Sequence, residues 1–310
     1  MGKLDGRVAV VTGAAMGNGE GIAGVMAKYG AHVALWDISD RVFETAKSIQ
    51  SEGHQATAYK VDVRNFDQCK SATAEIIQKL GKIDVLCNNA GISRMIPFLD
   101  MSDEDRDALF DVNIKGVWNC TKAVLPNMQE NQYGRIVIMS SVTGPMVANL
   151  GQTAYATSKA ALWGFTRALA LEVVGYNITV NAICPGMIRT PMVENEARVF
   201  SPDDPEPIIQ MIAGAIPMGR LGTILEIGEL ASRLQDEPTR VNHCPSSSSA
   251  AARPASRSSA SRDGLSTASS SRSTTARGLD FPSGAGRRPA HVQKSSQFIC
   301  RGSMTRERTG

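Results

Sequence analysis

Tyr155, Lys159 and Ser141 are the residues whose types and spacing point most directly to chemistry. Lys159 follows Tyr155 by four positions, and Ser141 precedes the tyrosine by fourteen. The apolar spacing of residues 153–175 predicts a helix, which places the phenol and the ammonium on one face. A nearby cation favours the phenolate and lowers the pKa of a tyrosine from its usual value of about 10. Tyr155 is then suited to exchange a proton with an alcohol or carbonyl oxygen, to which Ser141 can hydrogen-bond.

Two alternatives stand beside this interpretation. A tyrosine and a lysine four residues apart also occur by chance on the solvated faces of many helices. Ser140 competes with Ser141 as the working hydroxyl, because successive side chains at the end of the predicted strand 135–139 point to opposite sides. The elements that position these groups must therefore decide between the interpretations.

A glycine-rich turn follows the first apolar run of the chain, residues 8–11. A continuously apolar strand is typical of a parallel sheet that is covered on both faces. Gly13, Gly17 and Gly19 come directly after this run and open a helical pattern. Glycines at such a place permit a tight turn, and they let backbone N–H groups at a helix N-terminus approach a phosphate.

Asp37 closes the second predicted strand, residues 32–37. A carboxylate here, about 20 residues past the glycines, can bind both ribose hydroxyls of an adenosine and repels a 2′-phosphate. Ile38 follows it and Met16 lies in the glycine turn, so neither position supplies a cation for such a phosphate. The sequence therefore favours NAD over NADP. The alternative is that Asp37 only caps the helix that begins near Ser39.

Strands alternate with helices over the first 235 residues. Further strands are predicted at 57–61, 83–87, 135–139 and 178–184, and further helices at 40–52, 65–80, 103–129, 208–213 and 224–234. This alternation predicts an α/β fold with a doubly wound parallel sheet, the Rossmann fold. Ligands bind beyond the carboxyl ends of such strands, where Gly13, Asp37, Asp62, Asn89, Ser141 and Pro185 all fall. Asp62 has the alternative role of a helix cap, and Asn113 that of a satisfied core amide.

Six motifs occur in the order and at the spacing of the classical short-chain dehydrogenase/reductase family, over about residues 4–235. They are Thr12-Gly13-x-x-x-Gly17-x-Gly19, Asn88-Asn89-Ala90-Gly91, Asn113, Ser141, Tyr155-x-x-x-Lys159 and Pro185-Gly186. The chain resembles this family on these grounds. Residues 98–103, 113–119 and 181–186 further resemble a bacterial oxidoreductase within it.

The resemblance implies an oxidoreductase that transfers a hydride between a nicotinamide cofactor and a secondary alcohol, ketone or aldehyde. It implies Tyr155 as the acid/base, Lys159 as the group that lowers its pKa and holds the nicotinamide ribose, and Ser141 as the hydroxyl that polarises the substrate oxygen. Asn113 would seat a water in a proton relay through Lys159. The implied cofactor-binding residues are Thr12, Gly13, Gly17, Asn18 and Gly19 in the turn, Asp37 at the adenosine ribose, Asp62 and Val63 at the adenine, Asn89, Ala90 and Gly91 beside the cofactor, Pro185, Gly186 and Ile188, and Thr190 at the nicotinamide carboxamide, together with Tyr155 and Lys159.

The chain departs from the family after about Gln235. The family's closing strand, with the signature T-G-x-x-x-x-V-D-G-G, is absent, and residues 237–310 are rich in serine and arginine. Seventeen serines and few large apolar residues in 241–310 predict a disordered tail, which leaves residues 1–236 as the dehydrogenase domain. A frameshift near Leu234 is the explanation that we favour over a genuine appended tail.

The missing strand and the charged tail raise two other functional hypotheses. An unpaired sheet edge would make the protein a weakened or inactive nucleotide-binding remnant, and would remove part of the family's usual homo-oligomer contact. Ten arginines and one lysine against three acidic residues give 241–310 a net charge of +8, which leaves −5 for the first 240 residues. Such a tail would attract nucleic acid without sequence preference, although we do not expect nucleic acid as the partner.

Composition predicts a soluble cytoplasmic protein with a small-molecule substrate and no metal site. The six cysteines show no metal-ligand spacing, no apolar run approaches the roughly 20 residues of a membrane span, and no signal peptide precedes Leu4. The predicted substrate pocket is lined by residues 93–96, 144–147, Met187 and a lid over 192–218. This mostly apolar, methionine-containing set suggests a modest apolar carbonyl compound.

Overall fold

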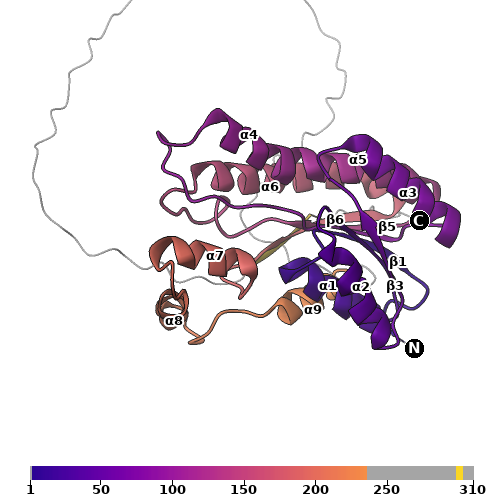
Figure 1. Cartoon of the computed structure of the whole chain (residues 1–310). Coiled ribbons are helices and arrows are strands. Elements are labelled where there is room, and N and C mark those ends of the chain that lie inside the picture. Colours follow the sequence, from indigo (N-terminus) through magenta and orange to yellow (C-terminus); the bar gives the residue numbers. More distant parts are fainter. Residues whose placement is uncertain (1, 236–297, 303–310) are drawn as a thin grey trace, which may run out of the picture. The chain divides into compact units, whose positions relative to one another are not determined.

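The computed structural model describes residues 2–235 and the backbone of 298–302, and these hold a seven-stranded sheet with helices on both faces (Figure 1). The strands are β1 (Val8–Thr12), β2 (His32–Asp37), β3 (Ala56–Lys60), β4 (Val85–Asn88), β5 (Gly134–Met139), β6 (Ile178–Cys184) and β7 (Phe298–Gly302). Their order is β3-β2-β1-β4-β5-β6-β7, and the first six run parallel. The strand order reverses beside β1, so a crevice opens between the carboxyl ends of β1 and β4. The predicted Rossmann fold is confirmed.

Side chains alternate across the sheet and build one core on each face. Ala9 and Val11 pack with α1 (Gly17–Lys28), α2 (Arg41–Ser51) and α9 (Ile224–Arg233). Val8 and Val10 belong to the opposite core, with α3 (Phe66–Leu80), α5 (Gly116–Glu130) and α6 (Thr153–Val173). Because β1 is covered on both sides, all five of its residues are buried, and its run is apolar until Thr12.

The long helix predicted for residues 103–129 is interrupted. It consists of α4 (Asp103–Phe110), a π-helical turn η1 (Asp111–Lys115), and α5. π-Helical turns are rare, appear mostly as single turns inside α-helices, and are frequent at functional sites. Asn113 lies at the middle of η1. A second short element, the 3₁₀ turn η2 (Val174–Tyr176), continues α6.

Two helices beyond β6 form a small cluster of their own, α7 (Pro191–Phe200) and α8 (Glu206–Ala215). Val193 and Ala197 of the first helix belong to one apolar cluster with Ile209 of the second. The sequence predicted α8 but no helix at 191–200. The signal was Thr190, whose hydroxyl accepts a hydrogen bond from Val193 N, with a proline next to it at the first helical position.

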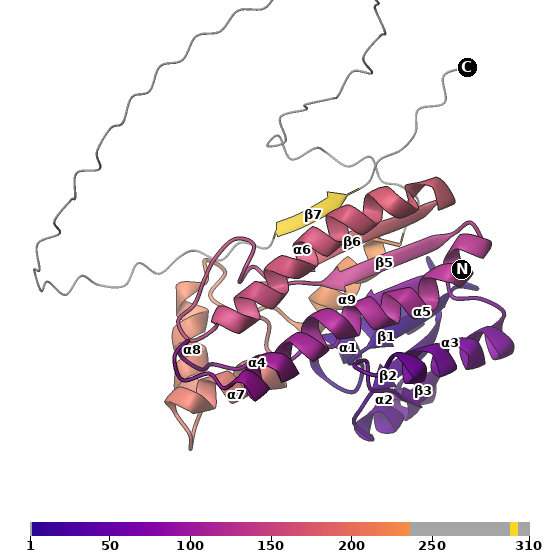
Figure 2. The same cartoon turned by 90° about the horizontal axis from the view of Figure 1, so that it is seen from above.

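The edge of the sheet beside β6 differs from the prediction of an unfinished edge. β7 pairs with β6 in the antiparallel direction, with Phe298 opposite Cys184 and Gly302 opposite Val180 (Figure 2). Residues far along the chain thus occupy the edge position, and the backbone groups of β6 are paired there. The predicted disorder of the remaining tail, 237–297 and 303–310, lies outside the described residues. Among the described helices, none is long and apolar enough to cross a membrane.

Candidate active site

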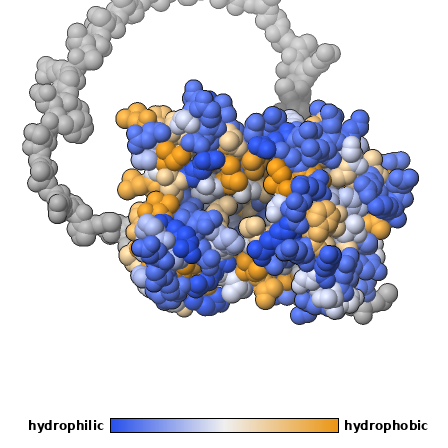
Figure 3. All heavy atoms as spheres, in the orientation of Figure 1, coloured by the Kyte–Doolittle hydropathy of each residue, from blue (hydrophilic) through white to orange (hydrophobic). Residues whose placement is uncertain are grey.

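A cavity of about 920 Å³ lies at the carboxyl ends of β1, β2, β4, β5 and β6. In the space-filling view a hollow opens near the centre of this face, with apolar surface around it (Figure 3). The predicted residues that line the cavity are Gly13, Gly17, Asn18, Asp37, Asp62, Val63, Asn89, Ala90, Gly91, Ser141, Tyr155, Lys159, Pro185, Gly186, Ile188 and Thr190. The other three, Thr12, Gly19 and Asn113, are buried and do not line it.

Thr12 and Asn89 tie the glycine turn to the end of β4. The Thr12 hydroxyl accepts hydrogen bonds from the backbone N–H groups of Asn89 and Ala90, both at 3.0 Å. In return, Asn89 Nδ2 donates to the carbonyl oxygens of Thr12 at 3.0 Å and Gly13 at 3.1 Å. Gly13 has a φ of 63°, and a Cβ there would lie 2.8 Å from Ala90 Cα. Only glycine therefore fits this turn.

The turn presents the N-terminus of α1 to the cavity. Met16 is the N-cap residue, and its side chain makes no capping hydrogen bond, so the first amides of the helix keep their capacity to bind an anion. Asp37 lies beside the turn, where its Oδ2 accepts from Ala15 N at 3.0 Å. Uncapped amides for a pyrophosphate, with a carboxylate for a ribose nearby, fit a dinucleotide cofactor.

The two carboxylates at the strand ends have different partners. Asp37 Oδ1 accepts from Ser39 N at 2.9 Å, while Asp40 is the N-cap residue of α2. Asp62 pairs with Arg64 at 2.7 Å, and this guanidinium lowers the pKa of the carboxyl. Asn65, not Asp62, caps α3, because its side chain accepts from Gln68 N. Arg64 also lines the cavity, and the sequence analysis did not single it out.

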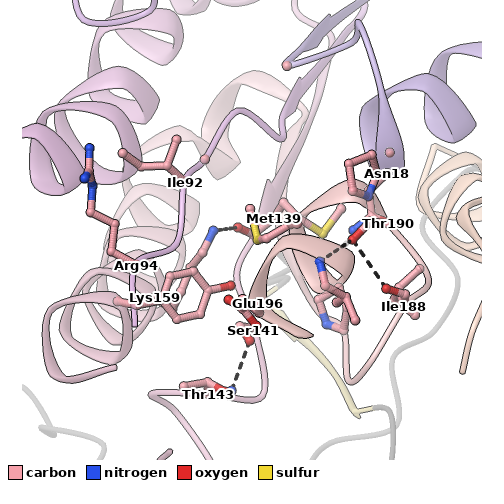
Figure 4. A pocket seen from close by; sticks show the side chains of 18 of the residues that line it. Asn18, Ile92, Arg94, Met139, Ser141, Thr143, Lys159, Ile188, Thr190 and Glu196 are labelled. Atoms are coloured by element: carbon pink, nitrogen blue, oxygen red, sulfur yellow. Dashed lines mark hydrogen bonds between the residues drawn. The ribbon is translucent and has the colours of Figure 1, made fainter. Parts of the chain in front are cut away.

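Tyr155, Ser141 and Lys159 meet at one end of the cavity. Ser141 hydrogen-bonds with Tyr155, and its Oγ also accepts from Thr143 N at 3.1 Å. Lys159 Nζ lies 5.6 Å from the centre of the tyrosine ring and donates to Met139 O at 2.9 Å. Figure 4 shows Lys159 and Ser141 together at this end, and Asn18, Thr190 and Ile188 at the other.

Ser140 and Ser141 have different partners, and Lys159 is buried. Ser140 Oγ donates to the backbone carbonyl of Lys159 at 2.9 Å, so it anchors α6 to β5. Ser141 is the serine that contacts the phenol. Lys159 is only 4 % exposed, and α6 therefore does not present it on a solvated face.

Burial shifts both titrating groups away from their ordinary values. It raises the pKa of Tyr155 to about 12; the hydrogen bond with Ser141 lowers this pKa, and the negative charge of Glu196 raises it. Burial also lowers the pKa of Lys159 to about 8. The sequence predicted a lowered pKa for the phenol. In the structure desolvation of the phenolate is the larger effect, because Tyr155 lies inside the cavity wall.

Lys159→Met is expected to remove a pH dependence of stability. Between about pH 8 and its ordinary pKa of 10.5, the unfolded chain holds a proton on Lys159 that the native protein has lost. Stability therefore rises with pH in this window, by up to about 1.4 kcal/mol per pH unit. Above the ordinary Tyr155 pKa of 10.0 the raised phenol pKa opposes this trend, since the native state then holds the extra proton.

The measurement is thermal unfolding from pH 7.5 to 9.5 without cofactor. The wild type should gain several degrees relative to Lys159→Met, at roughly 2–4 °C per kcal/mol for a domain of this size. Lys47→Met, at an exposed position of α2, is the control and should follow the wild type. Parallel curves for all three proteins would show that Lys159 titrates normally.

Asn113 holds the loop after β4. Its Oδ1 accepts from Ile92 N at 2.8 Å, and its Nδ2 donates to Ile92 O at 2.9 Å and Ser158 Oγ at 3.0 Å. Both amide hydrogens are thus used within the protein. A Cβ on Gly91 would lie 3.3 Å from Asn113 Oδ1 and 3.4 Å from Lys159 Nζ, so the amide and the ammonium flank this glycine.

The substrate side of the cavity is more polar than predicted. Met187 and Met192 line it as expected, but residues 144–147 do not. Arg94 and Glu196 also line it and fall within the predicted ranges 93–96 and 192–218, whereas Thr143, Asn149 and Gln152 line it outside every predicted range. Gln152 and Glu196 carry no motif in sequence. Only the packing of α7 beside the start of α6 brings them together.

Comparison with known proteins shows to which family the chain belongs. The family described as short chain dehydrogenase matches residues 7–199. The chain belongs to the short-chain dehydrogenase family. It is 54% identical over 237 residues to oxidoreductase UcpA of Salmonella typhimurium, which covers 76% of this chain and 90% of that protein. This short-chain dehydrogenase is therefore an oxidoreductase of a family that uses a nicotinamide cofactor.

Two further relatives of this short-chain dehydrogenase are more distant. It is 40% identical over 229 residues to 3-oxoacyl-[acyl-carrier-protein] reductase FabG of Thermotoga maritima, which covers 74% of the chain and 89% of that protein. A crystal structure of NAD+-bound xylitol dehydrogenase superposes with a TM-score of 0.70 at 33% identity, which covers 76% of this chain and 94% of that one.

Proposed function

We propose that this short-chain dehydrogenase interconverts a secondary alcohol and a ketone, or reduces an aldehyde, with Tyr155 as the acid/base and NAD as the preferred cofactor. The observation that carries the proposal is the contact between Tyr155 and Ser141, with buried Lys159 beside the same ring. A phenol and a hydroxyl that meet in a cavity can both bind one substrate oxygen. The cation next to them favours the phenolate when a proton is removed.

In the oxidation direction the phenolate of Tyr155 takes the proton of the alcohol and becomes the phenol, and in reduction the phenol gives a proton to the carbonyl oxygen and becomes the phenolate. Ser141 donates a hydrogen bond to that oxygen and keeps it next to the phenol. Lys159, fixed by its bond to Met139 O, supplies positive charge while the phenolate forms. The nicotinamide, when bound, accepts or donates the hydride. Asn113 keeps Ile92 and the loop after β4 in place, and we assign it the positioning of a proton-relay water.

The glycine turn, Asp37 and Asp62 are proposed to hold the cofactor. Amides at the start of α1 bind the pyrophosphate, and Asp37 accepts hydrogen bonds from the adenosine ribose. Asp62, held by Arg64, faces the adenine. A 2′-phosphate would meet the charge of Asp37, while Met16 and Ile38 line the same region without a cation. This arrangement favours NAD over NADP.

Asp37→Ala is expected to narrow the preference for NAD. Loss of a charge-assisted hydrogen bond, worth roughly 1.5–3 kcal/mol, should lower the NAD-to-NADP ratio of kcat/KM by about tenfold or more. Asp40→Ala is the control, because Asp40 is exposed and pairs with Lys60 at 2.7 Å. An unchanged ratio in Asp37→Ala would mean that Asp37 only supports Ala15 and Ser39.

Ligand-dependent unfolding of the full chain tests the proposal against the hypothesis of an inactive remnant. NADH should raise the midpoint of a cooperative transition more than NADPH does, since a ligand that binds only the native state stabilises it by mass action. A transition that responds to neither cofactor would reject the proposed function.

A further inference from the structure

Glu196 brings a carboxylate into the catalytic end of the cavity that the proposed chemistry does not use. It projects from α7, is half-buried, and lies close enough to Tyr155 for its charge to act on the phenol. In Figure 4 it stands next to Ser141, on the substrate side of the cavity. Burying a carboxylate there costs desolvation free energy unless hydrogen bonds compensate for it.

A chain of neutral polar groups holds this carboxylate. Gln152 Nε2 donates to Glu196 Oε1 at 3.2 Å, and Ser93 also hydrogen-bonds to the carboxylate. Asn149 Nδ2 donates to Gln152 Oε1 at 3.0 Å and to Thr143 Oγ1 at 3.1 Å, which sets the orientation of the Gln152 amide. Gln152 itself is 5 % exposed. The network therefore aims donors at Glu196 from a buried and fixed position.

The charge of Glu196 is not matched by a cation in the part of the chain whose side chains the structure describes. Within residues 2–235, no lysine or arginine makes an ion pair with it, whereas Glu194 on the same helix pairs with Arg189 at 3.5 Å. Arg94 lines the cavity but pairs with Asp105 at 2.8 Å, and in Figure 4 its guanidinium extends away from Glu196. A carboxylate has about four acceptor sites, so two neutral donors leave capacity for a ligand.

We propose that Glu196 is a specificity-determining residue that selects uncharged substrates with a second hydroxyl beside the reacting carbon, namely vicinal diols, polyols and α-hydroxy ketones. The inference rests on the proposed function, since it places the reacting oxygen at Ser141 and Tyr155. The neighbouring hydroxyl then donates to Glu196. Hydrogen bonds to an ionised acceptor are about twice as strong as neutral ones, which makes this contact selective.

The reaction leaves the second hydroxyl unchanged. In oxidation the C–H bond of the reacting carbon breaks and its hydride passes to NAD+, while the O–H proton passes to Tyr155. A C=O bond forms, and the products are an α-hydroxy ketone and NADH. A substrate with a carboxylate in place of the second hydroxyl would meet the charge of Glu196. Such acids are therefore disfavoured.

The test compares 2,3-butanediol with 2-butanol, which differ only in the second hydroxyl, as substrates of the full-length protein with NAD+. The wild type should oxidise the diol with a kcat/KM at least about tenfold higher, the size of one charge-assisted hydrogen bond. Glu196→Gln should lower this diol-to-monool ratio of kcat/KM severalfold. Glu196→Ala should bring the ratio close to one. Glu194→Gln, on the same helix, should keep the wild-type ratio.

The ratio separates recognition from a role in holding α7. If Glu196 only pins α7 to Gln152, both substrates lose activity together and the ratio stays constant, which would overturn the inference. A wild-type ratio near one, or oxidation of 2-hydroxybutanoate as fast as the diol, would also overturn it. Turnover of monools with no diol preference leaves the proposed function standing. If NADH does not stabilise the protein and the protein oxidises neither alcohol, the proposed function and the role of Glu196 are both rejected.

Discussion

Tyr155→Phe is expected to lower kcat by about 100-fold to 10 000-fold, the usual contribution of a positioned acid/base group. The ring of phenylalanine fills the same space, so the cavity keeps its shape and only the exchangeable proton is lost. Binding of NADH should stay within about twofold of the wild type, since Tyr155 is one of many residues that we propose to contact the cofactor. The measurement is steady-state turnover together with NADH titration.

Tyr176→Phe is the matched control, because Tyr176 lies in η2 and is 39 % exposed. Its kcat should equal that of the wild type. Retained turnover in Tyr155→Phe would remove the phenol from the mechanism and leave Ser141 or a water as the proton carrier. Loss of NADH binding in Tyr155→Phe would instead indicate that the hydroxyl supports the fold of the site.

The common location of most residues that we propose to bind the cofactor could be predicted from sequence, for a physical reason. In a parallel sheet every strand delivers its following residue to the same edge, so local patterns at Gly13, Asp37 and Asn89 predict their common location. The strand 178–184 illustrates this, because its predicted bounds coincide with those of β6. Periodicity locates a strand, and the end of the strand then fixes where the next residues of the chain lie.

The substrate side could not be predicted in the same way. Glu196 and Gln152 meet across 44 positions of sequence, and their contact depends on how α7 packs beside the start of α6. The break of the helix 103–129 at Asn113 could not be predicted either, since a π-helical turn of five residues is too short to leave a periodic signal of its own. The sign of the Tyr155 pKa shift depends on burial, which spacing along a helix does not report.

The strand that pairs with β6 at the edge of the sheet could not be predicted from sequence, for another reason. The absent signature predicts that the usual strand does not follow α9, but pairing with β6 needs only a backbone that can be extended. β7 supplies it in the antiparallel direction, which requires no crossover helix. Strand pairing by residues this far along the chain leaves no periodic signal next to α9.

Gly19→Ala is expected to weaken NADH binding by about tenfold or more and to lower stability by roughly 1–3 kcal/mol, the usual cost of overpacking. A Cβ at this position would collide with the carbonyl oxygen of Gly13 and lie 2.7 Å from Asn89 Nδ2. Neither group can yield, because Asn89 holds both carbonyls of the turn and Thr12 holds Asn89. The turn must therefore open, and the amides of α1 lose their alignment toward the cavity.

Gly24→Ala is the matched control within the same helix. A Cβ at Gly24 meets nothing within 4 Å, so the variant should bind NADH normally and gain about 1 kcal/mol from the higher helix propensity of alanine. NADH titration and urea unfolding of both variants give the comparison. If Gly19→Ala bound NADH as well as Gly24→Ala does, the pyrophosphate would not depend on the glycine turn, and the cofactor would have to enter the cavity in another orientation.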